Sequence, residues 1–383
     1  MPQPALVSGK RIPELDGIRG IAVLLVVIWH YVPCQIRNEA GFWVPFARRS
    51  LYLTGSGVDL FFVLSGFLIV GILVDERGAG NYLKVFYLRR ACRILPLYFL
   101  LLTLFVWLGT ATGLPAPSHQ WLFGNPLPVW SYATFTQNIV MGLRGGFGAG
   151  FMSITWSLAV EEQFYLVMPL LVLLLGGRKL AWVLPLGLIA VPLMRLGFPG
   201  FHAYVNTPWR ADPLLAGGCV ALLVRSARFA ALVRRNPRRL AVVGGVLLAV
   251  VPLMILYPGC LGVWDLSWLA VSYSLLVLAA ALGMYSQVWV VLRYPALMWL
   301  GKLSYGIYMF HQAASGLLHG WLGKQAPQIA NPRDMGITLL ALLATLAAAW
   351  TSYRIFESPI LRFGHRFRYY PAPGDHVVQA HTP

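Results

Sequence analysis

The sequence predicts an all-α fold, a polytopic membrane helical bundle of about ten transmembrane helices. The first observation is composition: 58% of the 383 residues are hydrophobic, 11% are charged, and the mean hydropathy is +0.67. The second is that the apolar residues gather in runs near the length that crosses about 30 Å of hydrocarbon. The third is an uneven distribution of positive charge. Together these properties lie outside the range of soluble globular domains.

Ten apolar runs define the predicted spans. They cover residues 17–32, 57–74, 94–113, 151–175, 180–197, 208–224, 240–257, 264–284, 297–321 and 335–353. A shorter run at 131–141 cannot cross, so we expect it at the interface or as a re-entrant segment. We expect a single transmembrane domain over 1–368 and a disordered tail over 369–383.

The formal net charge of +17 would suggest nucleic-acid binding in a soluble protein, but here its distribution indicates membrane orientation. With the N-terminus inside, 22 of the 30 Lys and Arg residues fall on the inner side. The sequence therefore predicts a chain embedded in a lipid bilayer, with cytoplasmic N- and C-termini and no nucleic-acid partner. Residues 1–30 lack a small-residue cleavage site and should stay attached as the first span.

The four cysteines form no metal-type pair, and we expect no metal. Cys34 and Cys260 fall on the outer side of this topology, but we do not expect them to form a disulfide. The largest outer loop, 114–150, is rich in Gly, Pro and Trp. Its aromatic residues either sit at the membrane interface or help to shape a site for an external substrate.

Two ionisable residues interrupt the first span: Arg19 near its start and His30 eleven positions later. Eleven steps of about 100° bring a helix back to within roughly 20°, so both side chains share one face about 16 Å apart. Ionisable residues inside a membrane helix are functional candidates by default.

The third span begins with Arg90 and Arg93, whose i, i+3 spacing turns both guanidinium groups the same way. Two convergent arginines suit a phosphate or pyrophosphate, because each can donate paired hydrogen bonds. The alternative interpretation is a positive-inside anchor, for which Lys or Arg at almost any position would serve.

The fourth span carries Glu161 and Glu162 side by side, with Tyr165 one turn further on. Adjacent helical residues point about 100° apart, so both carboxyl groups cannot face one cavity squarely. An ionised Glu facing lipid is costly, so each must find a partner, reach water or stay protonated. A helix-pairing salt bridge and a proton-handling group both remain open.

The ninth span places Ser304, Tyr308 and His311 at helical spacings of four and three. This polar stripe should face the bundle interior, either for interhelical hydrogen bonding or to contact substrate. We expect His311, toward the outer leaflet, to contact an acceptor. In the second span, Asp59 lies near the outer end, and Ser65 and Gly66 are interpreted first as packing residues.

These motifs together resemble the membrane-bound acyltransferase-3 family. The resemblance covers nearly the whole chain, in the family's order. The matching blocks are Leu15 to Ala22 with His30, Gly57 to Phe67, Arg90 to Arg93, Trp156 to Tyr165, Leu303 to Tyr308 with His311, and Phe356 to Pro359.

The resemblance implies an integral membrane enzyme that moves an acyl group, often acetyl, from cytoplasmic acyl-CoA to a hydroxyl of a carbohydrate or cell-surface glycan. In the family, the residues required for activity map onto Arg19, His30, Arg90 and Arg93. The fourth-span carboxylate of the family maps better onto Glu161 than onto Glu162. A bacterial inner-membrane location follows. Some relatives carry an additional esterase-like domain with a Gly-Asp-Ser motif; this chain has Gly374-Asp375-His376, so we expect that domain to be absent.

The resulting hypothesis docks the acyl-CoA phosphates at Arg90 and Arg93 and threads the pantetheine arm toward His30, acting as general base or acyl carrier. Arg19 would steer the acyl donor or set the protonation of the imidazole, and Glu161 would orient the acceptor or relay a proton. Substrate contacts are assigned to Tyr165, Ser304, Tyr308 and His311. Two rivals stay open: a proton-coupled transporter, and an enzyme that acylates a small cytoplasmic molecule.

Overall fold

The computed structural model describes residues 12–37, 44–111, 113–198, 200–284 and 287–371. Over these residues the chain is helical and contains no strand, which confirms the all-α part of the predicted fold class. Two isolated bridges pair Ile36 with Ile329 and Ala79 with Pro371. Most of the predicted tail, residues 372–383, lies outside the described residues.

The helices follow one another with short connections. The first half contains α1 (Pro13–Tyr31), α2 (Val44–Ser50), η2 (Tyr52–Ser56), α3 (Gly57–Asp75), α4 (Tyr82–Ala111), α5 (Ala116–Phe123), α6 (Val129–Ala133), α7 (Gln137–Arg144) and α8 (Thr155–Gly197). The second half contains α9 (Phe201–Val205), α10 (Thr207–Arg210), α11 (Asp212–Arg225), α12 (Ala227–Arg235), α13 (Pro237–Ala249), α14 (Val251–Leu256), η3 (Gly262–Trp264), α15 (Asp265–Ala281), η4 (Val288–Arg293), α16 (Pro295–Leu318), η5 (His319–Gly323), α17 (Pro332–Ser352), η6 (Tyr353–Glu357) and α18 (Ser358–Gly364).

Within the described ranges, six helical segments are long and apolar enough to cross a membrane, or seven if the bent pair α11 and α12 counts as one span. The number ten thus stays a prediction. The two numbers differ in part because two predicted spans lie within the single segment α8. Non-helical backbone at Gly176 (φ 63°, ψ 169°) divides this segment. They also differ because α1 contains the charged residues Glu14, Asp16 and Arg19, and it is therefore not among the six apolar segments.

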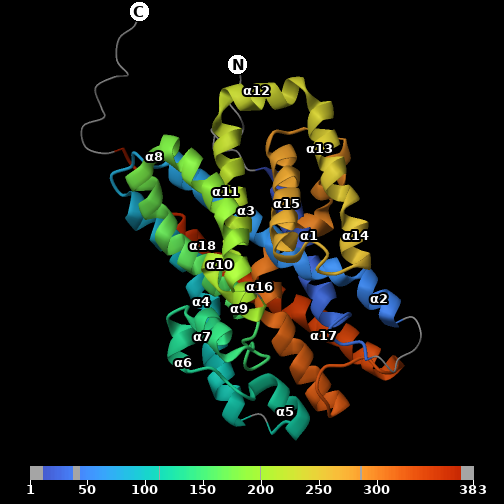
Figure 1. Cartoon of the computed structure of the whole chain (residues 1–383). Coiled ribbons are helices and arrows are strands. Elements are labelled where there is room, and N and C mark those ends of the chain that lie inside the picture. Colours follow the sequence, from blue (N-terminus) through green and yellow to red (C-terminus); the bar gives the residue numbers. More distant parts are fainter. Residues whose placement is uncertain (1–11, 38–43, 112, 199, 285–286, 372–383) are drawn as a thin grey trace, which may run out of the picture.

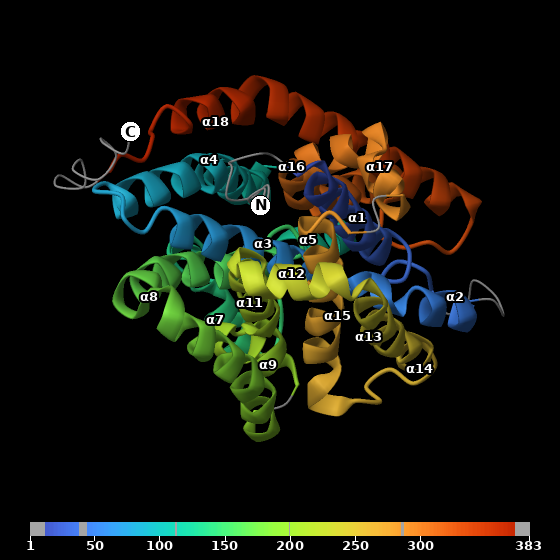
Figure 2. The same cartoon turned by 90° about the horizontal axis from the view of Figure 1, so that it is seen from above.

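The two ends of the bundle differ in what they carry. Figure 1 shows α12 at one end and α5, α6 and α7 at the other. These are the segments that the predicted topology places on opposite sides of the membrane. Seen from above, α17 and α18 run along one edge, with α4 and α16 beside them (Figure 2). Near the centre, α1 packs along α16 and α3, and α3 packs along α11.

Small residues let the central helices approach one another closely. A Cβ atom on Gly66 would lie 1.9 Å from the Leu214 carbonyl oxygen, and one on Gly217 would lie 2.0 Å from that of Val63. Such contact between backbones is typical of membrane helix pairs, where packing replaces the hydrophobic effect. Gly66 is therefore a packing residue, as expected. Ser65 differs, since its hydroxyl bonds to that of Tyr165. All four cysteines are free.

Candidate active site

Most of the predicted site residues line one cavity, which we call the arginine cavity. Its empty volume is about 810 Å³. Of the nine predicted site residues, seven line it: Arg19, Arg90, Arg93, Glu161, Tyr165, Ser304 and Tyr308. They come from α1, α4, α8 and α16, so tertiary packing brings together side chains as far apart in sequence as residues 19 and 308.

The arginines of this cavity have different surroundings. Arg19 donates a hydrogen bond to Asp16 Oδ1 at 3.1 Å. Over the described part of the chain, Arg90 and Arg93 form neither a hydrogen bond nor an ion pair with a protein group. Both also line a second, smaller cavity, which we call the basic mouth, with Arg89, His365 and Tyr369. Two guanidinium groups that line two cavities and form no hydrogen bond within the described residues are suited to hold an anionic ligand.

The basic mouth is held in place by the segment after α18. Arg89 donates two hydrogen bonds to the Phe367 carbonyl oxygen, at 2.9 and 2.6 Å, and its guanidinium lies 5.2 Å from the Tyr369 ring centre. Burial lowers the pKa of the His365 imidazole, and the nearby charges of the arginines lower it further. Both effects favour the neutral imidazole, so the arginines are the source of positive charge in the mouth.

The two adjacent glutamates face different spaces. Glu161 lines the arginine cavity, whereas Glu162 lines a separate cavity beside Gln163. This division follows the 100° angle between neighbouring helical side chains. Of the two carboxyl groups, Glu161 alone therefore shares the arginine cavity with Arg19.

His30 lines a different space, which we call the histidine cavity. Its empty volume is about 1740 Å³, and Asp59 and Gln312 line it too. Aromatic side chains make up much of the remaining wall: Trp29, Tyr52, Phe147, Trp156, Phe201 and Tyr204. Val58 and Tyr308 line both this cavity and the arginine cavity. The two cavities are therefore adjacent, and these residues form part of both walls.

His30 is oriented by neighbouring groups. Its Nδ1 lies 2.9 Å from the Val26 carbonyl oxygen and 3.3 Å from His311 Nε2, and His311 Nδ1 lies 2.6 Å from the Tyr308 carbonyl oxygen. A carbonyl oxygen only accepts hydrogen bonds, so both rings carry a proton on Nδ1 when neutral. This leaves Nε2 as the lone-pair nitrogen of His30. His311 is fully buried and lines neither of these two cavities, and its Nε2 faces His30.

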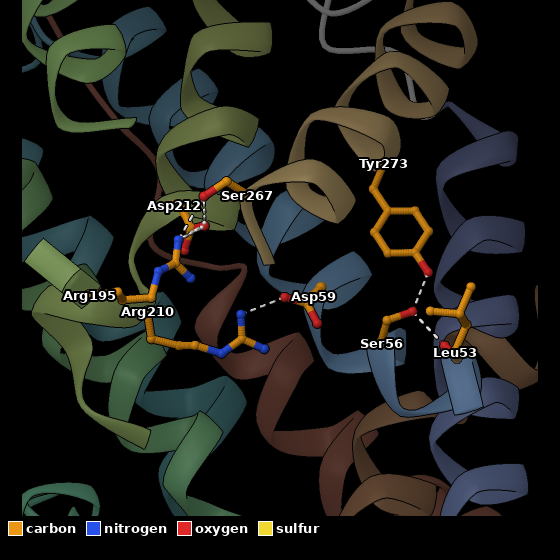
Figure 3. Close-up of polar contacts among 8 residues, drawn as sticks. All are labelled: Leu53, Ser56, Asp59, Arg195, Arg210, Asp212, Ser267 and Tyr273. Carbon is orange, nitrogen blue, oxygen red and sulfur yellow. Dashed lines mark hydrogen bonds and ion pairs between the residues drawn. The ribbon is translucent and has the colours of Figure 1, made fainter. Parts of the chain in front are cut away.

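Two buried ion pairs lie beside the histidine cavity, and the sequence-based assignment of roles missed both (Figure 3). Arg210 donates to Asp59 Oδ1 at 2.5 Å, and Arg195 donates to Asp212 Oδ2 at 2.7 Å. Ser267 donates to the same Asp212 oxygen at 2.8 Å. Charged residues within apolar segments were the signal that could have found these groups, but their pairing depends on contacts between distant helices. Among the described residues, no three His, Cys, Asp or Glu side chains form a metal-binding group.

Comparisons with known proteins agree with this picture. A family model described as an acyltransferase domain matches residues 12–354. The peptidoglycan O-acetyltransferase OatA of Listeria monocytogenes is 27% identical, with 93% of this chain and 57% of OatA aligned. YrhL of Bacillus subtilis, provisionally named a peptidoglycan O-acetyltransferase, is 28% identical over 93% of this chain and 56% of its own. This chain thus spans just over half the length of these relatives. No solved structure matches it.

Proposed function

The chain belongs to the acyltransferase-3 family, and on that premise we propose that it is a membrane O-acyltransferase acting on a cell-surface glycan. The acyl donor is cytoplasmic acyl-CoA, with acetyl as the group transferred. The acceptor is a carbohydrate hydroxyl on the outer side, and peptidoglycan is the glycan to test first, since relatives are named for it. The enzyme resides in a bacterial inner membrane with both termini cytoplasmic.

One observation carries this proposal: an arginine-lined cavity and a histidine-lined cavity are adjacent, with Val58 and Tyr308 in both walls. Acyl transfer between the two sides of a membrane needs such a pair of sites, because a polyanionic donor and a sugar acceptor must reach one point from opposite directions. Arg90 and Arg93 would hold the phosphates at the border of the basic mouth. The pantetheine arm would extend through the arginine cavity, so that the thioester reaches Val58 and Tyr308. We call the position of these two residues the junction.

The chemistry at the junction uses His30. The acceptor oxygen attacks the thioester carbonyl carbon, while Nε2 of His30 takes the hydroxyl proton. The carbon–sulfur bond then breaks, and the leaving thiolate takes the proton from the imidazolium. If His30 instead carries the acyl group, the same Nε2 attacks the thioester carbonyl carbon and the CoA thiolate leaves. The acceptor hydroxyl then attacks the acyl carbon, the bond from that carbon to Nε2 breaks, and the hydroxyl proton passes to the thiolate. His311 serves both routes by fixing the ring, and it acts as a positioning residue and not as a substrate contact.

The remaining residues of the arginine cavity have supporting roles. Arg19 steers the acyl donor, and Glu161 relays a proton or orients a reacting group. The Tyr308 hydroxyl donates to the Ile154 carbonyl oxygen at 2.9 Å and contacts the Ser157 hydroxyl at 2.6 Å. These bonds set the position of the Tyr308 side chain, which contacts the acyl donor together with Ser304 and Tyr165 of the same cavity.

The test uses the purified chain in proteoliposomes with radiolabelled acetyl-CoA and soluble peptidoglycan glycan fragments. We expect labelled glycan and CoA release that depends on the acceptor. His30→Ala should abolish both, whereas His319→Gln should not. His319 is a second buried histidine, which bonds to Thr338 and lines neither cavity. Uptake of substrate without CoA release would favour a proton-coupled transporter. Transfer to small cytoplasmic molecules but to no glycan would overturn the proposed acceptor.

A further inference from the structure

Asp59, in the first turn of α3, brings a carboxylate to the wall of the histidine cavity. Its side chain is 3% exposed, and that of its partner Arg210 is 1% exposed. Buried ion pairs contribute little net stability, because desolvation of both charges offsets their attraction. Stability alone therefore does not explain this pair, and its carboxylate is available to the cavity that it lines.

The arginine of this pair is fixed from several directions. Its guanidinium carbon lies 5.6 Å from the Phe62 ring centre, 5.8 Å from that of Trp156 and 5.3 Å from that of Tyr204. Trp156 and Tyr204 also line the histidine cavity. The aromatic wall of the cavity thus holds Arg210, and Arg210 in turn holds one oxygen of Asp59. The second oxygen, Oδ2, forms no hydrogen bond with the described part of the chain.

The neighbouring ion pair provides a comparison within the same protein. Arg195 and Ser267 both donate to Asp212 Oδ2, which links α8, α11 and α15. Neither Arg195 nor Asp212 lines the histidine cavity, whereas Asp59 does. Figure 3 shows the two pairs close together, with Ser267 completing the second. The pair at Asp212 ties helices together, while the pair at Asp59 also presents a carboxylate to the cavity.

We propose that Asp59 is an acceptor-binding residue, which accepts hydrogen bonds from saccharide hydroxyl groups and so orients the hydroxyl to be acylated toward His30. The inference rests on the proposed function. An ionised carboxylate accepts about four hydrogen bonds and Arg210 supplies one, so capacity remains for hydroxyl donors. The aromatic side chains of the wall cover the apolar faces of sugar rings, and Gln312 adds an amide on the same cavity.

The experiment compares two double variants that each neutralise one ion pair. They are Asp59→Asn with Arg210→Gln, and the matched control Asp212→Asn with Arg195→Gln. Removing both charges avoids leaving one buried and unpaired. Steady-state transfer from acetyl-CoA to soluble peptidoglycan glycan fragments gives KM for each substrate and kcat. We expect the first variant to raise the acceptor KM tenfold or more, with the acetyl-CoA KM within twofold. In the control, both KM values should stay within twofold of wild type.

A second variant covers the case in which the first fails to fold. Asp59→Glu keeps the charge opposite Arg210 but moves the carboxylate by one methylene. It should keep the thermal midpoint and raise the acceptor KM severalfold. Equal acceptor KM in wild type, Asp59→Glu and the folded double variant would overturn the inference while leaving the proposed function intact. A wild-type protein that transfers acetyl groups to no glycan would overturn the proposed function, and the inference with it.

Discussion

The arginine cavity and the histidine cavity share Val58 and Tyr308 but differ in chemistry. The first holds three arginines and Glu161 in an empty volume of about 810 Å³. The second is about twice as large, and its wall has six aromatic side chains besides the shared Tyr308. Dense positive charge suits a polyanionic ligand, whereas aromatic faces with few charges suit a neutral sugar. This difference supports the proposal that each cavity takes one of the two substrates.

The largest expected effect comes from removing the proposed base on the histidine side. His30→Ala should lower kcat by about 10³-fold, because a positioned general base contributes on the order of 10² to 10⁴-fold. Rapid acid quenching with labelled acetyl-CoA measures transfer and any acyl-enzyme together. Near wild-type transfer by well-folded His30→Ala would remove His30 from the mechanism.

Substitutions at the two arginines should weaken binding of the acyl donor and leave binding of the acceptor unchanged. The double substitution Arg90→Ala with Arg93→Ala should raise the acetyl-CoA KM about 100-fold, since hydrogen bonds to charged groups contribute about 1.5–3 kcal/mol each. The acceptor KM should not change. Lys84→Ala, which removes an exposed charge from the same helix, is the control. If the control raises the acetyl-CoA KM as much as the double variant does, general electrostatic attraction would explain the effect, and a specific phosphate site would not.

The junction can be blocked by a substitution at Val58 that leaves the proposed donor-binding and acceptor-binding residues unchanged. Val58→Trp should lower kcat by about 100-fold, because misplacement of reacting groups by about 1 Å can cost that much. Both KM values should remain near wild type, since the proposed binding residues are untouched. Val58→Ala, which widens the junction, should keep kcat within a few-fold. A Val58→Trp variant with normal kcat would show that the acyl group does not pass between the cavities here.

The smallest effect should come from the residue behind the base. His311→Leu should lower kcat about tenfold with unchanged KM values, because it removes an acceptor for the Nδ1 proton of His30. The Val26 carbonyl oxygen still holds that proton, which limits the loss. His311→Gln retains a hydrogen-bond acceptor and should restore most of the activity. A rise in acceptor KM in His311→Leu would favour the original prediction of a substrate contact.

Most residues that line the arginine cavity could be predicted from the sequence, because a bilayer restricts where polar side chains can lie. Ionisable and hydroxyl side chains in apolar segments must face the bundle interior, so seven of nine predicted residues share one cavity. The 100° rule also separated Glu161 from Glu162. Other features depend on contacts that no local pattern encodes. Arg19 and His30 were expected to share a helix face, yet they line different cavities, and Val58 of α3 and Tyr308 of α16 line both.

By itself, the sequence determined the all-helical class, the apolar segments and the polar residues that lipid would reject, because hydrogen bonding and hydration restrict what a membrane chain can expose. Tertiary structure alone decided which of these polar groups meet. It paired His311 with His30, joined Asp59 to Arg210 across 151 positions, and placed Val58 and Tyr308 between two cavities. The physical reason is that such pairing depends on how distant helices pack, which close approach at residues such as Gly66 and Gly217 sets.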